Sequence, residues 1–213
     1  MNKEVFENGF KEKIDKNFLE RSKYYDFNLE VFCEFSTLIF EINNCLLLEL
    51  NRASITLTNH LLERLLKLAL INNETGIGPI EFEKWNEVFL EPNKKHGTSD
   101  LANSIEKCKK IELITEKEKN VLFNTIRVLM RNGFSHADSS KILADFPDDS
   151  KMFQGSFSNP NEKLKEVNVN QKIIPTFQAI QMENFAKDNS KTYFDFVFHL
   201  IFRIEKRLIE KLK

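Results

Sequence analysis

The chain has 213 residues, of which 41% are hydrophobic and 30% are charged, and its formal net charge is −1. This balance is typical of a globular protein and excludes a disordered chain, while the near-zero charge excludes a global basic field for tight, non-specific nucleic-acid binding. No run approaches the roughly 18 apolar residues of a membrane span, and the N-terminal stretch lacks the apolar core of a signal peptide, so we expect one cytoplasmic domain over residues 1–213.

Three helices are predicted before residue 73. The segments 10–25, 28–50 and 54–72 repeat apolar residues at spacings of three and four, and the polar residues 51–53 interrupt the pattern as a turn. The third segment is the most apolar, which predicts the central helix of the core. The residues expected to face inward are Ile14, Phe18 and Leu19 in the first segment and Phe32, Phe35, Leu38, Ile39, Ile42 and Leu46 in the second.

The central helix carries one polar stripe. His60, Glu63, Arg64 and Lys67 occupy the i, i+3, i+4 and i+7 positions of a single face. The simplest interpretation is a solvated face on which Glu63 pairs with Lys67, for roughly 0.2–0.5 kcal/mol. The alternative is that part of this stripe belongs to a functional site.

Between residues 73 and 111, glycines and prolines predict loops around two short helices. The first, over 81–90, contains the single tryptophan, Trp85, as a packing anchor, and the second ends near residue 111. The basic run 94–96 falls on the loop between them. Solvation explains that run, and contact with an RNA backbone is the alternative.

The next helix has the clearest start signal in the chain. Thr115 is followed three residues later by Glu118, the reciprocal capping pair that satisfies the first free N–H groups of a helix. Gly133 follows the last periodic apolar residue, and a glycine at that place usually ends a helix in a left-handed turn. The residues expected on the buried face are Leu122, Ile126 and Leu129.

Arg131 and His136 lie on either side of that expected break. On an unbroken helix they would be about 140° apart, because each residue turns the chain about 100°. A break at Gly133 lets the chain fold back and return His136 to Arg131. A guanidinium beside an imidazole suits phosphate chemistry, since arginine neutralises a phosphate and histidine moves protons near neutral pH.

Turn residues predict irregular structure after this motif, over 139–174. The segments 152–157 and 165–169 within it alternate roughly, so we expect a loop or a small β-hairpin inserted in a helical scaffold. Pro175 opens a helix to about residue 187, and a regular apolar stripe predicts a further helix over 190–212.

Asp195, His199 and Arg203 follow one another at i+4 spacing on another face of the last helix. A solvated face with local hydrogen bonds explains them better than a catalytic triad does.

The string LMRNGFSHA, with Arg131, Asn132 and His136, resembles the signature of HEPN domains. In that signature an arginine near the end of an amphipathic helix is followed by a polar residue, often asparagine, and then by a histidine. The helix pair over 45–70 is also similar to these domains, in which an acidic residue of the second helix packs toward the motif; Glu63 takes that place. The resemblance covers about residues 40–138 and the C-terminal helices. It implies an all-α, antiparallel helical bundle.

The resemblance also implies an activity, because many HEPN proteins are metal-independent endoribonucleases of toxin, phage-defence or RNA-processing systems and work as homodimers. Arg131 would then stabilise charge on the scissile phosphate, and His136 would act as general base or acid on the ribose 2′-hydroxyl, leaving a 2′,3′-cyclic phosphate and a 5′-hydroxyl. Asn132 would orient His136 or the phosphate, and Glu63 would hold Arg131 in its rotamer. The expected partners are RNA, a second copy of the chain, and an antitoxin or another defence protein.

Two alternatives stay open. The first is a non-catalytic HEPN module that binds a nucleotide, RNA or a partner protein. It is favoured by the near-neutral charge and by Asp138, which stands where the nucleotidyltransferase-paired toxins of the family usually carry a tyrosine. The second is a purely structural arrangement, in which Arg131 pairs with Glu63 or Asp138 and His136 caps a helix.

Other chemistry has no motif to support it. Gly-rich phosphate loops and the HExxH and CxxC spacings are absent from the sequence, so we expect neither a cofactor nor a metal. Cys33, Cys45 and Cys108 have no paired spacing, which favours free thiols in a reducing compartment.

Overall fold

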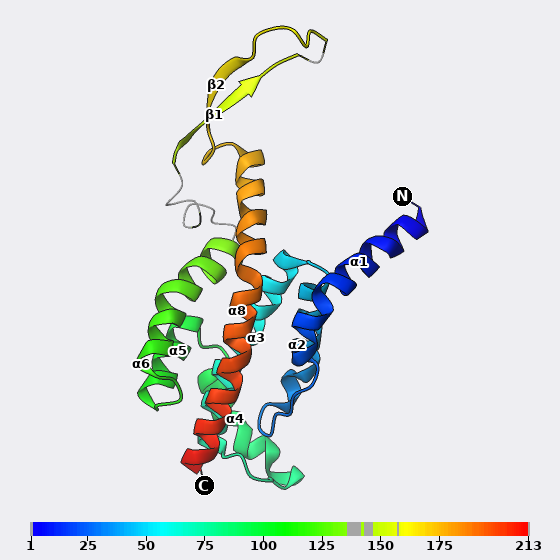
Figure 1. Cartoon of the computed structure of the whole chain (residues 1–213). Helices are drawn as coiled ribbons and strands as arrows, with labels where there is room; N and C mark the ends of the chain where they lie inside the picture. Colours follow the sequence, from blue (N-terminus) through cyan, green and yellow to red (C-terminus); the bar gives the residue numbers. More distant parts are fainter. Residues whose placement is uncertain (1, 136–141, 143–146, 157, 213) are drawn as a thin grey trace.

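A computed structural model describes residues 2–135, 142, 147–156 and 158–212, without the side chains of Asn132 and Ser135. It is a helical bundle with a two-stranded antiparallel hairpin beyond one end (Figure 1), which confirms the all-α class with a small hairpin. The α-helices are α1 (Lys3–Arg21), α2 (Ser36–Leu47), α3 (Asn51–Thr75), α4 (Trp85–His96), α5 (Leu101–Lys110), α6 (Glu116–Asn120) and α8 (Pro175–Leu212). Short 3₁₀ turns are η1 (Ser22–Tyr24), η2 (Cys33–Phe35) and η3 (Phe82–Lys84), the π-helix is η4 (Val121–Ser135), and the strands are β1 (Asp149–Gln154) and β2 (Lys165–Asn170).

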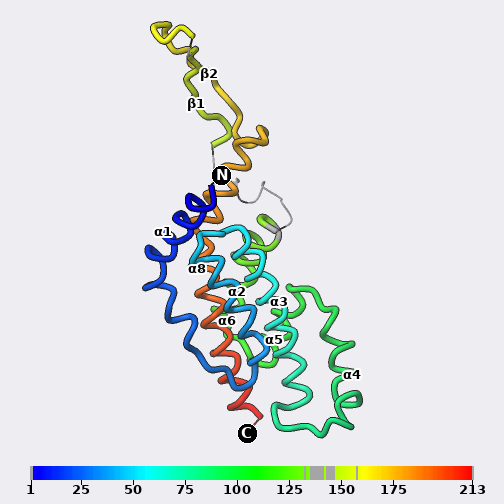
Figure 2. Tube along the Cα trace, turned by 90° about the vertical axis from the view of Figure 1, so that its right-hand side faces the viewer, coloured from blue at the N-terminus to red at the C-terminus, as the bar shows by residue number. Residues whose placement is uncertain are grey.

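Helix α3 is the centre of the bundle, as its apolar sequence predicts. It packs against α2, α4, α5, η4 and α8, and Figure 2 shows α1 and α4 on opposite sides of the α3–α8 pair. Burying a leucine or isoleucine side chain contributes about 1.5–3 kcal/mol, so α3 supplies a large share of the hydrophobic free energy. Its fully buried apolar residues are Ile55, Leu61, Leu62, Leu65, Leu66 and Ala69.

The break between the second and third predicted helices lies earlier than the sequence indicates. The chain turns at 48–50, where Glu49 has a φ of 59°, and residues 51–53 already belong to α3. The second predicted helix is also shorter, because η2 and α2 cover only 33–47. Its expected buried residues are confirmed except Leu38, which is half-buried.

Helix α1 buries its polar side, contrary to the prediction. Ile14, Phe18 and Leu19 are exposed, and Asn17 and Arg21 are the buried residues of this helix. Only the C-terminal part of α1 lies on the bundle, while its N-terminal part projects away from it (Figure 1). Polar contacts rather than apolar periodicity therefore fix the orientation of α1.

The buried guanidinium of Arg21 makes two of these polar contacts. Its Nε donates to Asn43 Oδ1 at 2.9 Å and its Nη1 to Asp195 Oδ1 at 3.2 Å.

On α8, Arg203 Nε likewise donates to Glu118 Oε1 at 2.6 Å. Asp195 and Arg203 are 35% and 40% exposed, so the face is partly solvated as predicted. Both nevertheless bind other helices, and the prediction of local hydrogen bonds is wrong for them.

The basic run 94–96 also differs from its prediction, since it forms the last turn of α4 and not a loop. His96 is buried and its Nε2 lies 2.9 Å from Glu74 Oε1, and the Lys95 ammonium bonds to the same carboxylate. These two contacts tie the end of α4 to the end of α3.

Helix α8 is one continuous element from Pro175 to Leu212, where the sequence predicts two helices. No glycine or proline interrupts it after Pro175, and Ser190 Oγ donates to Asn51 Oδ1 at 2.8 Å near the expected break. Among the helices that the structure describes, none combines the length and the apolar composition of a membrane span.

The hairpin falls inside the predicted insertion at 139–174. Strands β1 and β2 pair in antiparallel register, with Ser150 opposite Val169 and Met152 opposite Val167. Most of their residues are exposed, and the hairpin stands beyond the end of the bundle at which α8 begins (Figure 1).

Candidate functional site

The helix that carries the motif opens as the sequence predicts. Glu118 N donates to Thr115 Oγ1 at 3.2 Å, and Thr115 N donates to Glu118 Oε2 at 2.7 Å, which completes the capping box of α6. From Val121 to Ser135 the backbone is a π-helix. Such turns are rare and are frequent at functional sites.

The side chains buried by η4 follow a strict four-residue spacing. Met130 occupies the third buried position, and Leu129, which the α-helical pattern predicts there, is half-buried. The wider turn of a π-helix explains the change, because residues four apart then stay on one face. The buried hydrophobic side chains of η4 are Leu122, Ile126, Met130 and Phe134.

Gly133 does not end the helix, and the prediction of a break there is wrong. It lies inside η4, and Gly76 is the only described glycine with a positive φ. A Cβ on Gly133 would lie 3.1 Å from Cγ1 of Ile142. The glycine therefore permits close packing against Ile142 and does not supply a left-handed turn.

The structure brings together two of the four predicted site residues. Arg131 Nε donates to Glu63 Oε1 at 2.6 Å, and the two side chains are 30% and 29% exposed. A charge-assisted bond of this length fixes the guanidinium relative to α3. Glu63 of α3 thus pairs with Arg131 of η4. The expected ion pair between Glu63 and Lys67, both of which the structure describes, is not formed.

The other two predicted site residues cannot be placed in this way. His136, like Asp138, lies outside the described residues, and of Asn132 only the backbone is described. The return of His136 to Arg131 stays a prediction.

Two of the remaining residues of the polar stripe on α3 are exposed to solvent. Arg64 is exposed, and its guanidinium carbon is 5.9 Å from the centroid of the Phe35 ring, near η2. His60 is exposed as well. Glu63 is thus the one member of the stripe for which the structure gives a contact with η4.

Two residues outside the predicted site lie next to the Arg131–Glu63 pair. Asn59, one turn before Glu63, donates to the Met130 carbonyl at 3.0 Å and accepts a hydrogen bond from Tyr193 Oη at 2.6 Å. Asn59 and Tyr193 are buried. We call Asn59, Glu63, Arg131 and Tyr193 the motif cluster; it joins α3, η4 and α8.

The electrostatics of the motif cluster keep the Tyr193 hydroxyl protonated, so that it remains a hydrogen-bond donor. Burial raises the pKa of Tyr193 well above its ordinary value, and the nearby negative charge of Glu63 raises it further. The hydroxyl therefore remains protonated and bonded to Asn59 throughout the physiological range. The uncharged hydrogen bonds from Tyr193 to Asn59 and from Asn59 to the Met130 carbonyl hold the backbone next to Arg131 against α3.

One signal in the sequence could have identified Asn59. It is an asparagine in the most apolar segment of the chain, four residues before Glu63 and therefore on the same helix face. A polar residue at such a place must find a hydrogen-bond partner, because an unsatisfied buried amide is costly. Tyr193 gives no comparable signal, since tyrosine is common on an apolar stripe.

Comparison with family models, with curated proteins and with solved structures gives no match for this chain. Within the part of the chain that the structure describes, no three histidine, cysteine, aspartate or glutamate side chains gather as ligands for a metal ion.

The Tyr193→Phe substitution is expected to lower the free energy of unfolding by about 1–2 kcal/mol, because Asn59 Oδ1 loses its buried donor. Denaturant unfolding of the two proteins measures this. The matched control is Tyr25→Phe, whose hydroxyl bonds to Asn44 Oδ1 at 2.7 Å in a partly exposed place where water can replace it. Equal losses for the two variants would contradict a special role of the buried hydroxyl.

Proposed function

We propose that this chain is an HEPN-like, metal-independent endoribonuclease that acts as a homodimer, in a toxin or phage-defence role. The observation that carries the proposal is the 2.6 Å bond between Arg131 and Glu63. It holds the arginine of the motif on the neighbouring helix while leaving part of its side chain exposed to solvent. An arginine in such a place can meet a phosphate with little further ordering of its side chain.

In the proposed reaction the ribose 2′-hydroxyl attacks the adjacent phosphorus. His136 takes the proton of that hydroxyl, the bond between phosphorus and the 5′-oxygen breaks, and the departing oxygen takes up a proton. Arg131 stabilises the negative charge that builds on the phosphate oxygens. The products are a 2′,3′-cyclic phosphate and a 5′-hydroxyl, and Asn132 orients His136 or the phosphate.

The motif cluster supplies the rigidity that this chemistry requires. The side chain of Glu63 fixes the rotamer of Arg131, and the hydrogen bonds from Tyr193 through Asn59 to the Met130 carbonyl fix the backbone beside it. A catalytic group held by such supporting contacts is less costly to position in the transition state. In the proposed homodimer, the second copy contributes its own Arg131 to a shared site.

A non-catalytic HEPN-like module that binds a nucleotide, RNA or a partner protein is the second candidate. It is favoured by the Glu63 carboxylate, which compensates the charge of Arg131, and by the net charge of −1. Both features weaken the local field that draws a polyanion to the site. Binding of a nucleotide or a partner protein, with no cleavage of RNA, is therefore the outcome expected of this candidate.

The deciding experiment compares purified wild-type protein with His136→Ala on a mixture of structured and unstructured RNAs, with and without a metal chelator. The proposed function predicts chelator-resistant cleavage by the wild type, products with 2′,3′-cyclic phosphate and 5′-hydroxyl ends, and loss of cleavage in the variant. Expression of each protein in a bacterial host should show a growth defect that the substitution relieves. Intact RNA in every wild-type reaction, with no growth defect, contradicts the proposal.

A further inference from the structure

A second candidate site lies on the other side of α3. Leu68 and Asn72 of α3 point about 140° or more away from Glu63 and Asn59, since each residue turns the helix about 100°. They line a cavity of about 560 Å³ between α3, α4 and the chain at 31–34. A second hollow of about 590 Å³ adjoins it. Volumes of this size are typical of small-molecule sites.

The two hollows share walls. Val31, Glu34, Trp85 and Phe89 line both of them, so the space continues from α3 past α4 to the loop at 78–80. Apolar and aromatic side chains form most of the surface. A ligand that fills the space must therefore carry an apolar or aromatic body.

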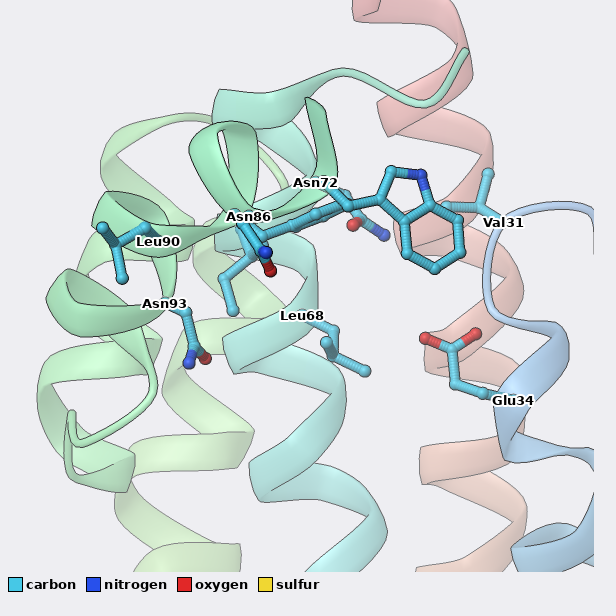
Figure 3. Close-up of a pocket in the computed structure, with 10 residues that line it drawn as sticks. Val31, Glu34, Leu68, Asn72, Asn86, Leu90 and Asn93 are labelled. Atoms are coloured by element: carbon cyan, nitrogen blue, oxygen red, sulfur yellow. The ribbon is translucent and has the colours of Figure 1, made fainter. Parts of the chain in front are cut away.

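The polar groups of the cavity lie on two sides of it. Figure 3 shows the Glu34 carboxylate on one side and the carboxamides of Asn72, Asn86 and Asn93 on the other, with Leu68 between them. The hydrogen bonds and ion pairs formed within the described part of the chain leave these four side chains without a partner. Their acceptor oxygens are therefore available to a ligand.

Trp85 provides a fixed aromatic surface at this place. Its Nε1 donates to the Ile80 carbonyl at 3.0 Å, and its ring lies 4.6 Å from that of Phe82, centroid to centroid. The indole is nevertheless 46% exposed. A ring held by its own N–H presents its faces, which attract cations through the ring quadrupole.

The charge of the lining selects the ligand. Among the described residues that line either hollow, Glu34 is the one with a charge, and no lysine, arginine or histidine accompanies it. A phosphate or carboxylate ligand would meet a negative charge with no compensating cation. A cation meets the carboxylate, the carboxamide oxygens and the indole face, each of which stabilises positive charge.

We infer that this cavity binds a small organic cation, with a primary ammonium or guanidinium group on an apolar or aromatic body. The N–H groups donate to Glu34 and to the asparagine carboxamides, and the body lies against Trp85 and Phe89. The site is independent of the motif cluster and of the proposed ribonuclease activity.

Titration calorimetry of the full chain tests the inference with two probes of the same shape, phenethylammonium and 3-phenylpropionate. The cation is expected to bind saturably and at least about tenfold more tightly than the anion, because only the cation gains from the carboxylate and the indole face. Glu34→Gln should weaken binding of the cation about two- to fivefold, which is the range for an ion pair with an exposed carboxylate such as Glu34. Trp85→Leu, which keeps an apolar side chain, should weaken it by a similar factor.

The matched control is Glu83→Gln, which removes the same charge from an exposed residue of η3 that does not line the cavity. This variant should bind phenethylammonium as the wild type does. Equal affinity for the two probes, the absence of saturable cation binding, or equal effects of the Glu34 and Glu83 substitutions would each overturn the inference.

Discussion

Replacing Arg131 by alanine is expected to lower the rate of RNA cleavage about 10²–10³-fold, with a much smaller change in RNA binding. The reason is that the guanidinium acts on charge that develops only in the transition state, and removal of one such preorganised donor has an effect of this size. Single-turnover cleavage of one end-labelled RNA by the two proteins measures the ratio, and a separate binding titration measures affinity.

Arg127 offers a matched control within the same helix. It lies one turn before Arg131 in η4, where its guanidinium carbon is 4.1 Å from the centroid of the Phe123 ring. Arg127→Ala removes the same charge without touching the motif, so its cleavage rate should stay close to that of the wild type. If the Arg127 and Arg131 variants lose equal activity, the loss reflects general attraction of RNA and the proposed role of Arg131 is wrong.

Glu63→Gln separates the positioning of Arg131 from its charge. The amide keeps one acceptor for Arg131 Nε but loses the charge of the 2.6 Å bond. We expect a smaller loss of the cleavage rate than for Arg131→Ala. If part of that loss comes from weaker RNA binding, raising the RNA concentration should restore that part. Circular dichroism and thermal unfolding of each variant show whether the fold is kept. An unchanged cleavage rate in Glu63→Gln would show that the charge of Glu63 does not contribute to the site.

The sequence predicts those parts of this fold that local chemistry determines. The Thr115–Glu118 capping box needs only residues three apart, and the apolar run of α3 has no other place than the core. The orientation of α1 is different, because the Arg21 guanidinium bonds to Asp195, which is 174 residues away. No periodicity within 10–25 reports such a contact, and the apolar residues of α1 are therefore misleading.

The same distinction applies to the candidate site. Glu63 enters the candidate site only through the resemblance, since its spacing alone favours a solvated pair with Lys67. Asn59 and Tyr193 meet across 134 residues of sequence and could not be joined without coordinates. The predicted end of the motif helix at Gly133 rests on the rule that a glycine after the last periodic apolar residue ends a helix. The packing of Ile142 on Gly133 is a tertiary contact that this rule does not include.

A second large effect is expected at Glu118, whose carboxylate joins α6 to α8. It is nearly buried and accepts hydrogen bonds from Arg203 Nε at 2.6 Å, from Arg207 Nη1 at 2.8 Å and from Thr115 N at 2.7 Å. Glu118→Ala leaves both arginines without this partner and opens the capping box. The free energy of unfolding should fall by about 2–4 kcal/mol, toward the lower end because the arginines are partly exposed.

Denaturant unfolding measures this loss, and Glu116→Ala is the matched control. Glu116 belongs to the same short helix, but its side chain is exposed and its nearest ion-pair distance, to Lys109, is 3.8 Å. Its removal should change the free energy of unfolding by less than about 0.5 kcal/mol. A loss at Glu118 no larger than that at Glu116 would show that the network contributes no net stability.

The pH dependence of stability provides an independent check on the same carboxylate. Burial alone would raise the pKa of Glu118, but the hydrogen bonds from Arg207, from the Thr115 backbone and from Arg203 outweigh burial and lower it. A carboxylate with a lowered folded-state pKa stabilises the protein fully above its unfolded value, about 4.3, and loses this contribution as the pH falls through the folded-state value. The stability difference between wild type and Glu118→Gln should thus be largest near neutral pH and shrink below about pH 4. A difference that stays constant over this range would mean that the carboxylate charge is not what holds α6 on α8.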